Sequence, residues 1–319
     1  MSATVRIGTC SWADESLVKA WYPPSARTAE GRLRHYAELF DTVEVNSSYY
    51  AIPTAEAAAA WARRTPDGFV FHVKAFGMMT RHPVKADQLP PDLRGEVELD
   101  HRGRVEHPSR ELRAEVFDRF RTALQPLRDA GKLGGILMQF PPYVVMKPAS
   151  FAYLEWAQEQ LGGDEMLVEF RHRSWLENDE AAAETLAFLE RRGATYVMVD
   201  APRTDAKNLV PTVVGATSPT AYLRLHGRNA GTWNHRGGSA AERFDYLYSA
   251  EELAEWSEPL RRLSTLSERA FVMFNNNGRS AGDDGGPPIA QAPVNALMLR
   301  DVLHEAGVPV TDARRSALA

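Results

Sequence analysis

The sequence predicts an α/β fold, an irregular (β/α)8 barrel of the TIM type. Eight short β-rich runs recur along the 319 residues. Most of them are separated by stretches with apolar residues at i, i+3 and i+4, the spacing of amphipathic helices. Alternating strands and helices indicate parallel β/α architecture, and eight is the strand number of a closed barrel. A doubly wound open sheet is the competing interpretation.

The predicted strands are rich in β-branched and aromatic residues. They are expected within residues 5–12, 42–50, 69–76, 134–142, 166–175, 194–200, 221–229 and 270–277. Several of the predicted helices end at a glycine, as helix C-termini often do. They are expected within residues 31–40, 55–65, 110–131, 149–162, 179–193 and 249–266.

Two segments interrupt this alternation. Residues 77–110 are polar and carry mixed charge, and they form an inserted loop after the third strand that is either a solvated insertion or a lid. Residues 201–220 contain no convincing helix, so a helix is missing between strands six and seven. We expect one barrel domain over residues 1–310 and a frayed tail over 311–319.

The composition is that of an ordinary globular protein. A formal net charge of -5 argues against a general nucleic-acid binder, although a local basic pocket is compatible with it. Cys10 is the single cysteine and cannot form an intrachain disulfide, which indicates a reducing compartment. No apolar run reaches the roughly 18 residues of a membrane helix, and the first residues do not resemble a signal peptide. We therefore expect a cytoplasmic location and no membrane partner.

Hydrogen-bonding side chains recur near the carboxyl ends of the predicted strands, opposite an apolar face. In the second strand, Val43 and Val45 lie on one face and Glu44 and Asn46 on the other, because successive side chains alternate. In a barrel the apolar face packs on the helices and the polar face points inward. We therefore expect a polar pocket at the C-terminal mouth. Its residues are Glu44, Asn46, His72, Lys74, Gln139, Glu169, Arg171, Asp200, Arg224, His226, Arg228 and Asn275, with Asn276 as the alternative to Asn275.

Several motifs carry a family resemblance. They are GTCSW (8–12), WYPP (21–24), YAELFDTVEVNSSYYAIP (36–53), TPDGFVFHVKAF (65–76), ILMQFPP (136–142), VEFRHRSW (168–175), YLRLHGRN (222–229), FNNN (274–277) and VNAL (294–297). With these motifs in order along nearly the whole chain, the sequence resembles the YecE-like family, also called domain-of-unknown-function family 72. The resemblance implies a β/α barrel and no agreed biochemical activity. The chain departs from the family at GTCSW, where GTSGW is frequent, and in the long segment that follows FNNN.

The predicted mouth gathers several groups that are cationic or can become so. Arginine binds carboxylate and phosphate groups through two parallel hydrogen bonds, and barrels often hold phosphate near the last two strands. The sequence therefore predicts a small anionic substrate, phosphorylated or carboxylated. The alternative is a buried network in which the same cations only neutralise neighbouring carboxylates. The cationic groups are Lys74, Arg171, Arg224, His226 and Arg228.

An enzyme with acid–base hydrolase or lyase chemistry is the favoured class. Glu44, His226 and Lys74 are the candidate catalytic residues. No GxGxxG motif or P-loop is present, so no organic cofactor is predicted. The candidate substrate-binding residues are Asn46, His72, Gln139, Glu169, Arg171, Asp200, Arg224, Arg228, Asn275 and Asn276.

Two other functions compete with this interpretation. The first is a divalent-metal-dependent phosphoesterase or isomerase, but no HExxH motif or cysteine cluster is present, and no metal ligand is assigned. The second is a non-catalytic nucleotide-binding or nucleic-acid-binding protein. Trp233, His235 and Arg236 give it slight support, and it is not favoured.

Overall fold

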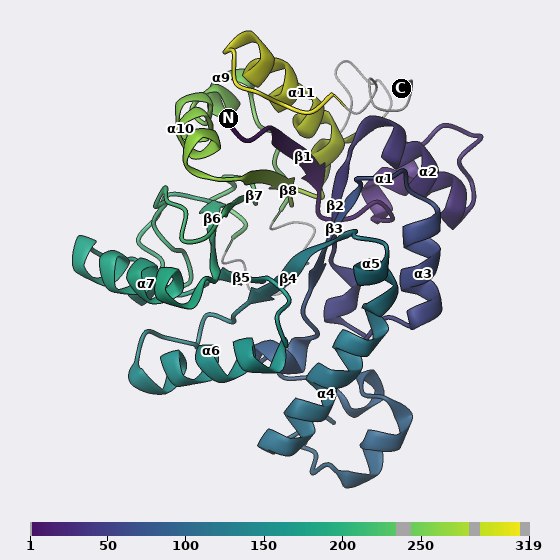
Figure 1. Cartoon of the computed structure of the whole chain (residues 1–319), viewed down its shortest axis with the longest axis vertical. Helices are drawn as coiled ribbons and strands as arrows, with labels where there is room; N and C mark the ends of the chain where they lie inside the picture. The colour runs from purple at the N-terminus through teal and green to yellow at the C-terminus, as the bar shows by residue number, and fades with distance from the viewer. Residues whose placement is uncertain (1, 234–243, 281–287, 313–319) are drawn as a thin grey trace.

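The computed structural model describes residues 2–233, 244–280 and 288–312 (Figure 1). Eight parallel strands form one sheet in the order β1–β8–β7–β6–β5–β4–β3–β2, and helices surround it. The sheet curves into a nearly closed barrel, which confirms the predicted fold class. The strands are β1 (Val5–Thr9), β2 (Thr42–Val45), β3 (Val70–Lys74), β4 (Leu133–Gln139), β5 (Met166–Glu169), β6 (Thr195–Asp200), β7 (Thr220–Leu225) and β8 (Arg269–Phe274).

All six predicted helical stretches contain helix, and each of two stretches is divided into two helices. Several helices begin at a side-chain cap: the oxygens of Thr28, Thr54, Ser109 and Asn178 each accept a backbone N–H of the first turn. The helices are α1 (Glu15–Ala20), α2 (Ala29–Leu39), α3 (Ala55–Arg63), α4 (Arg110–Ala123), α5 (Gln125–Asp129), α6 (Pro148–Gln160), α7 (Asp179–Arg192), α9 (Ala250–Ala254), α10 (Ser257–Leu266) and α11 (Gln291–Glu305). Helices α1 and α11 were not predicted.

The two segments that interrupt the alternation have different structures. No helix lies between β6 and β7, where residues 201–219 are all described, as the sequence predicts. Residues 77–109 contain three 3-10 helices, η2 (Gly77–Thr80), η3 (Ala86–Gln88) and η4 (Pro91–Glu96), and two antiparallel bridges. Val84 and Leu89 are buried in the insertion, so it is a folded segment rather than a loose solvated loop. It lies beside α4 in Figure 1.

The barrel has a seam between β1 and β2, the two ends of the hydrogen-bonded sheet. The hydroxyl of Tyr36, on α2, accepts the N–H of Thr9 at 2.9 Å and donates to the carbonyl oxygen of Thr42 at 3.1 Å. Gly8 allows the strands to approach, because a Cβ there would lie 2.3 Å from the same carbonyl oxygen. One side-chain hydroxyl thus bridges the strands where no backbone ladder does.

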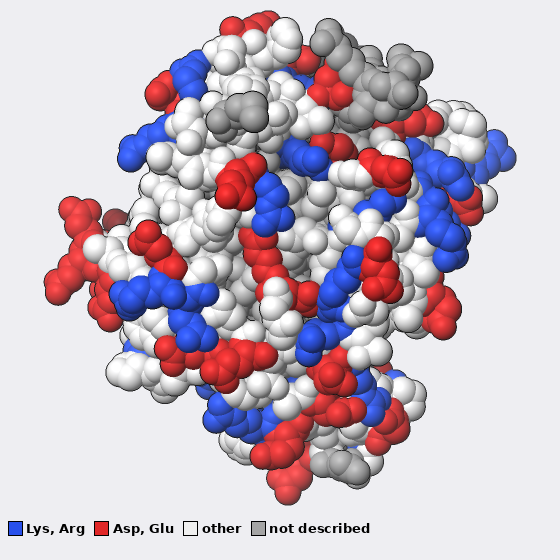
Figure 2. Space-filling view, in the orientation of Figure 1, with Lys and Arg blue, Asp and Glu red and all other residues white. Residues whose placement is uncertain are grey.

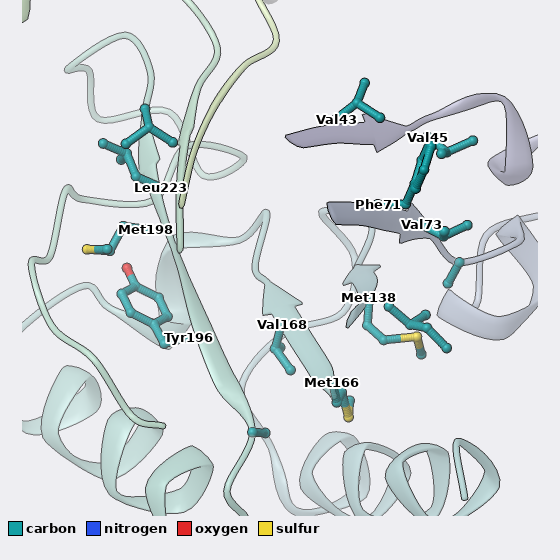
Figure 3. Packing of buried hydrophobic residues seen from close by; sticks show 14 of the residues in the cluster. Val43, Val45, Phe71, Val73, Met138, Met166, Val168, Tyr196, Met198 and Leu223 are labelled. Atoms are coloured by element: carbon teal, nitrogen blue, oxygen red, sulfur yellow. The ribbon is translucent and has the colours of Figure 1, made fainter. Parts of the chain in front are cut away.

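The two faces of the strands have the predicted characters. The outward face is apolar and packs under the helices, as Figure 3 shows for Val43, Val45, Phe71 and Val73. The interior has a separate apolar layer formed by Cys10, Leu137, Leu167, Val197, Tyr222, Phe271 and Met273. Polar residues lie above this layer, toward the carboxyl ends of the strands. Among the described residues, no helix is long and apolar enough to cross a membrane.

Candidate functional site

Arg224 lies at the centre of the barrel mouth and is fully excluded from solvent. Its Nη2 donates to Oε1 of Glu44 at 2.6 Å, and its Nη1 donates to Oε2 of Glu169. These residues come from β7, β2 and β5, and β2 is not a neighbour of β7 in the sheet. The ion pairs therefore cross the interior, and they satisfy two buried carboxylates that would otherwise be costly to bury.

Both carboxylates have a second partner. The Tyr222 hydroxyl donates to Oε2 of Glu44 at 3.0 Å. Oε1 of Glu169 forms an ion pair with Nε of Arg171. Burial alone would raise the pKa of Glu169, but the guanidiniums of Arg171 and Arg224 outweigh it and hold that pKa well below its usual range. Glu169 is therefore an anion at any physiological pH.

His226 is hydrogen bonded on both sides of its ring. Nε2 lies 3.0 Å from Nη2 of Arg171 and 3.3 Å from Oε1 of Glu169. Nδ1 lies 2.9 Å from Nδ2 of Asn275, whose Oδ1 accepts from Asn46 at 3.2 Å. Burial, followed by the nearby Arg171, lowers the pKa of His226 to about 3. The imidazole is therefore neutral, and it connects the amides of the mouth to the buried carboxylate.

Three cations converge on one neutral oxygen. Oε1 of Gln139 accepts from Lys74 Nζ at 3.2 Å, from Arg171 Nη2 at 3.3 Å and from Arg224 Nη1 at 3.3 Å. Lys74 Nζ also lies 4.7 Å from the ring centroid of Tyr49. Burial and then Arg224 lower the pKa of Lys74 to about 8. Lys74 therefore loses its ammonium proton at a lower pH than an ordinary lysine does.

A cleft of about 820 Å³ opens above these residues. Five of the predicted residues line it: Asn46, Lys74, Gln139, Arg171 and Asn275. Glu44, Glu169, Arg224 and His226 lie directly beneath as a fully buried layer. We call these nine residues the floor cluster. The sequence thus predicted a group of residues that the structure brings together.

Four of the predicted residues lie elsewhere. His72 lies two residues before Lys74 in β3, deep in the interior, with its ring 4.8 Å from Tyr222 and 4.4 Å from Phe271. Burial lowers its pKa to about 3. It belongs to the apolar layer and not to the cleft, because a two-residue step along a strand lowers a side chain by one layer.

Asp200 and Arg228 form a second group, outside the floor cluster. Asp200 has the outward parity of Tyr196 and Met198, so its carboxylate points toward the helices. It accepts from Arg228, from the Tyr248 hydroxyl at 2.9 Å and from Trp256 Nε1 at 2.9 Å. The prediction that Asp200 and Arg228 line the same pocket as Arg171 is therefore wrong in position. We call these two residues with Tyr248, Glu255 and Trp256 the Asp200 cluster.

The alternative between Asn275 and Asn276 has a clear geometric answer. Asn275 lines the cleft. Asn276 turns away from it, and its Nδ2 donates to the carbonyl oxygen of Tyr246 at 2.9 Å and to Oδ1 of Asn295 at 2.8 Å. Asn276 therefore joins the end of β8 to α11 and does not face a ligand.

Several cleft residues were absent from the predicted set. His82 enters from the insertion after β3, and Phe244 comes from the loop after β7, as does Trp233, which was named only for the nucleic-acid interpretation. Tyr49 and Tyr50 also line the cleft, whereas Trp12 and Trp175, which follow other strands, pack against neighbouring rings. Side chains in loops do not alternate between two faces, so the sequence does not indicate where they point. His235, Arg236, residues 281–287 and the end of the predicted tail, 313–319, lie outside the described residues.

Two features bear on the competing functions: the distribution of charge on the surface and the grouping of potential metal ligands. Acidic and basic side chains are interspersed over the face shown in Figure 2, without one extended basic patch on that face. Within the part of the chain that the structure describes, no three histidine, cysteine, aspartate or glutamate side chains converge as a set of metal ligands. Neither function gains support from these observations.

The fold and the mouth define a class, a β/α-barrel protein with a buried ionic network beneath an open polar cleft. The chain belongs to the DUF72 family, since the family model described as "Protein of unknown function DUF72" matches residues 6–316. It is similar to the UPF0759 protein YunF of Bacillus subtilis strain 168, with 34% identity over 286 residues that cover 88% of this chain and 92% of that protein. The family resemblance seen in the motifs is thereby confirmed.

Solved structures of the family have the same fold. A DUF72 family protein from Thermotoga maritima MSB8 is 30% identical, with a TM-score of 0.71 over 94% of this chain and 99% of that one. A DUF72 family protein from Enterococcus faecalis V583 is 25% identical, with a TM-score of 0.73 over 94% of this chain and 95% of that one.

Proposed function

We propose that the floor cluster binds a small anionic molecule, carboxylated or phosphorylated, and that the protein is an enzyme acting on it. The observation that carries this proposal is the charge of the cluster. Three cations, Lys74, Arg171 and Arg224, face two carboxylates, Glu44 and Glu169, and His226 is neutral. Among the described residues, Lys74 has no carboxylate partner. An anionic ligand would supply the negative charge that the described residues of the floor leave out.

The geometry separates residues that can touch a ligand from residues that position them. Arg171 is 12% exposed and Lys74 is partly exposed, and both line the cleft. Arg224 is fully buried, so its role is to hold Glu44 and Glu169 in place. The acidic residues at the rim are already engaged: Asp14 caps α1, Glu15 pairs with Lys19, and Asp245 accepts from Gln291. We therefore place the anionic group of the substrate at the floor, not at the rim.

The acid–base role falls to Lys74 in this proposal. Its pKa of about 8 lies close to neutral pH, where proton transfer is most effective. Glu44 is engaged by Arg224 and Tyr222, and His226 is bonded at both ring nitrogens beneath the cleft. We therefore assign Glu44 and His226 positioning roles. Hydrolase or lyase chemistry remains the proposed reaction class.

A reducing, cytoplasmic setting is part of the same proposal. Cys10 lines the cleft and lies 3.6 Å from Nη2 of Arg224. Burial, and then the charge of Glu44, raise the pKa of its thiol well above the usual value. The thiol is therefore protonated and unsuited to nucleophilic attack. Its role here is to pack beside the ion pairs.

Thermal unfolding in the presence of phosphate, sulfate, phosphoglycolate and sugar phosphates tests the proposal. At least one of these anions should raise the Tm of the native protein and lose that effect in Arg171→Met. Arg173→Met is the matched control, because Arg173 lies two residues away and pairs with the exposed Asp205. If Arg171→Met responds to every anion as the native protein does, the floor is not the binding site.

A further inference from the structure

Lys74, which is partly buried, differs from the buried Lys132 in the number of its hydrogen bonds. Nζ of Lys132 donates to the carbonyl oxygens of Ala62 and Thr65, each at 2.7 Å, and lies 3.3 Å from the Thr65 hydroxyl. These partners use all three of its protons. Nζ of Lys74 has one hydrogen bond within the described residues, to Gln139, and it faces the cleft. Lys74 is therefore held in place and still open to reaction.

The surroundings of Lys74 favour the neutral amine. Burial is the largest cause and Arg224 the next, and although Glu169 and Glu44 act in the opposite direction, the net effect lowers the pKa of Lys74 to about 8. Roughly a tenth of such a side chain is unprotonated at pH 7, a few hundredfold more than for an ordinary lysine. A desolvated lysine beside other cations is the known route to a nucleophilic amine.

From this geometry we infer that Lys74 is a nucleophile that forms a Schiff base with an aldehyde or ketone whose anionic group is held by Arg171. The inference rests on the proposed anion site, replaces the acid–base role of Lys74 with a covalent one, and names a reactive group of the substrate. The amine nitrogen bonds to the carbonyl carbon, and the carbonyl oxygen takes a proton to give a carbinolamine. The C–O bond then breaks, one water leaves with the proton lost by nitrogen, and a C=N bond forms. No oxidant or reductant takes part.

A proton carrier for these steps lies in the same wall of the cleft. His82 lines the cleft, and its ring lies 5.1 Å from the ring of Tyr49, which also contacts Lys74. Nδ1 of His82 lies 2.8 Å from the Thr80 hydroxyl, which orients the ring. Burial and then Lys74 lower the pKa of His82 to about 3, so the imidazole stays neutral and can pass a proton on only by taking one up at one ring nitrogen while it gives one up at the other.

A Schiff base would give a chemical role to the Lys74 amine, which faces the cleft above the buried ion pairs. A C=N group next to a reacting carbon withdraws electrons and allows a neighbouring C–C or C–H bond to break. The reaction class that follows is a lyase acting beside a carbonyl group. Arg224, Glu44 and Glu169 fix the surrounding charges without touching the substrate.

Borohydride trapping with pyridoxal 5′-phosphate, an anionic aldehyde, tests the inference directly. The chain has six lysines, Lys19, Lys74, Lys85, Lys132, Lys147 and Lys207, so peptide mass mapping can place the reduced adduct. We expect Lys74 to be labelled first, at least tenfold faster than any other lysine. The adduct should be lost in Lys74→Met and kept in Lys207→Met, which removes an exposed lysine.

Pyridoxal, which lacks the phosphate, distinguishes this inference from the proposed anion site. Faster labelling of Lys74 by the phosphorylated aldehyde, slowed by added phosphate, would support both. Equal labelling of Lys74 by the two aldehydes would support the nucleophile and contradict the anion site. Labelling confined to other lysines in the native protein would overturn the inference, and that result depends on no variant.

Discussion

The floor cluster and the Asp200 cluster both pair arginine with carboxylates near the carboxyl ends of barrel strands, yet they differ in whether each charged residue has an oppositely charged partner. Asp200 accepts from Arg228, Tyr248 and Trp256, and Arg228 also binds Glu255 at 2.9 Å. Every charge there has an opposite partner. In the floor cluster one cation, Lys74, has no carboxylate partner among the described residues and faces the cleft.

The difference teaches how to separate a structural ion network from a candidate binding site. The Asp200 cluster lies between the strands and helices α9 and α10. Its hydrogen bonds join the ends of β6 and β7 to the segment that follows β7. The floor cluster points into the barrel, beneath a cleft. Both contain arginine–carboxylate pairs, and they differ in direction and in the presence of a cation without a carboxylate partner among the described residues.

The largest expected effect separates the two clusters by stability. Arg224→Met leaves Glu44 buried without a cation and leaves Glu169 with Arg171 alone, and we expect a loss of about 3–5 kcal/mol in the free energy of unfolding. Arg228→Met should cost about 2 kcal/mol, because Asp200 keeps its bonds from Tyr248 and Trp256. Urea denaturation measures both. A smaller loss for Arg224→Met than for Arg228→Met would break the comparison.

The next largest effect is a gain, not a loss, in the free energy of unfolding. Lys74→Met should stabilise the protein by roughly 1–3 kcal/mol at pH 7, because it removes a partly buried cation that has no carboxylate partner among the described residues. The pKa of Lys74 in the folded protein, about 8, lies below its ordinary value. The unfolded chain therefore binds more protons above pH 8, and the cost of Lys74 falls as pH rises. The gain from Lys74→Met should shrink between pH 8 and about 10.5.

Lys132→Met is the matched control for that variant. It leaves the carbonyl oxygens of Ala62 and Thr65 without their donor, so we expect a loss of about 1–3 kcal/mol at pH 7. Denaturation curves of both variants at pH 7 and pH 9.5 give the comparison. Destabilisation by Lys74→Met would contradict the view that its charge is uncompensated.

Anion binding should depend on pH in the floor cluster. A bound anion favours the ammonium of Lys74, so affinity for phosphoglycolate should be highest below pH 8 and fall by up to about tenfold per pH unit above it. Isothermal titration between pH 7 and pH 9.5 measures this. Lys74→Met should bind weakly and without that dependence. A pH-independent affinity in the native protein would show that Lys74 does not sense the anion.

The smallest expected effects concern two adjacent asparagines, Asn275, which lines the cleft, and Asn276, which points away from it. Asn276→Ala removes the donor to Tyr246 and Asn295 and should cost about 1–2 kcal/mol of stability without changing anion affinity. Asn275→Ala removes the link between Asn46 and His226 and should weaken anion binding about three- to tenfold with little change in stability. The reverse pattern would place Asn276, not Asn275, at the site.

Alternation along the strands predicted most of the floor cluster. Glu44, Glu169 and Arg224 have inward parity near the ends of β2, β5 and β7, and they meet in the structure. Asp200 shares the parity of Tyr196 and Met198, so its outward direction was readable from the sequence. The prediction placed it in the mouth because it used position at the strand end alone.

Depth and loop direction were harder to predict. His72 has the inward parity of Lys74 but lies one layer deeper, and the sequence does not say where the apolar layer ends. His82 belongs to an insertion whose path no periodicity reveals. Helix α11 was missed because buried polar residues, Gln291 and Asn295, interrupt its apolar pattern. Their partners lie in distant loops.

An anomalous-scattering experiment tests the central claim, that the described residues of the floor carry one positive charge in excess. Crystals grown with selenate would reveal a bound anion by the selenium signal. We predict an anomalous peak in the cleft within hydrogen-bonding distance of Lys74 Nζ and the Arg171 guanidinium, and its loss in Lys74→Met. A cleft without a peak, in crystals that bind selenate at exposed arginines, would contradict the account.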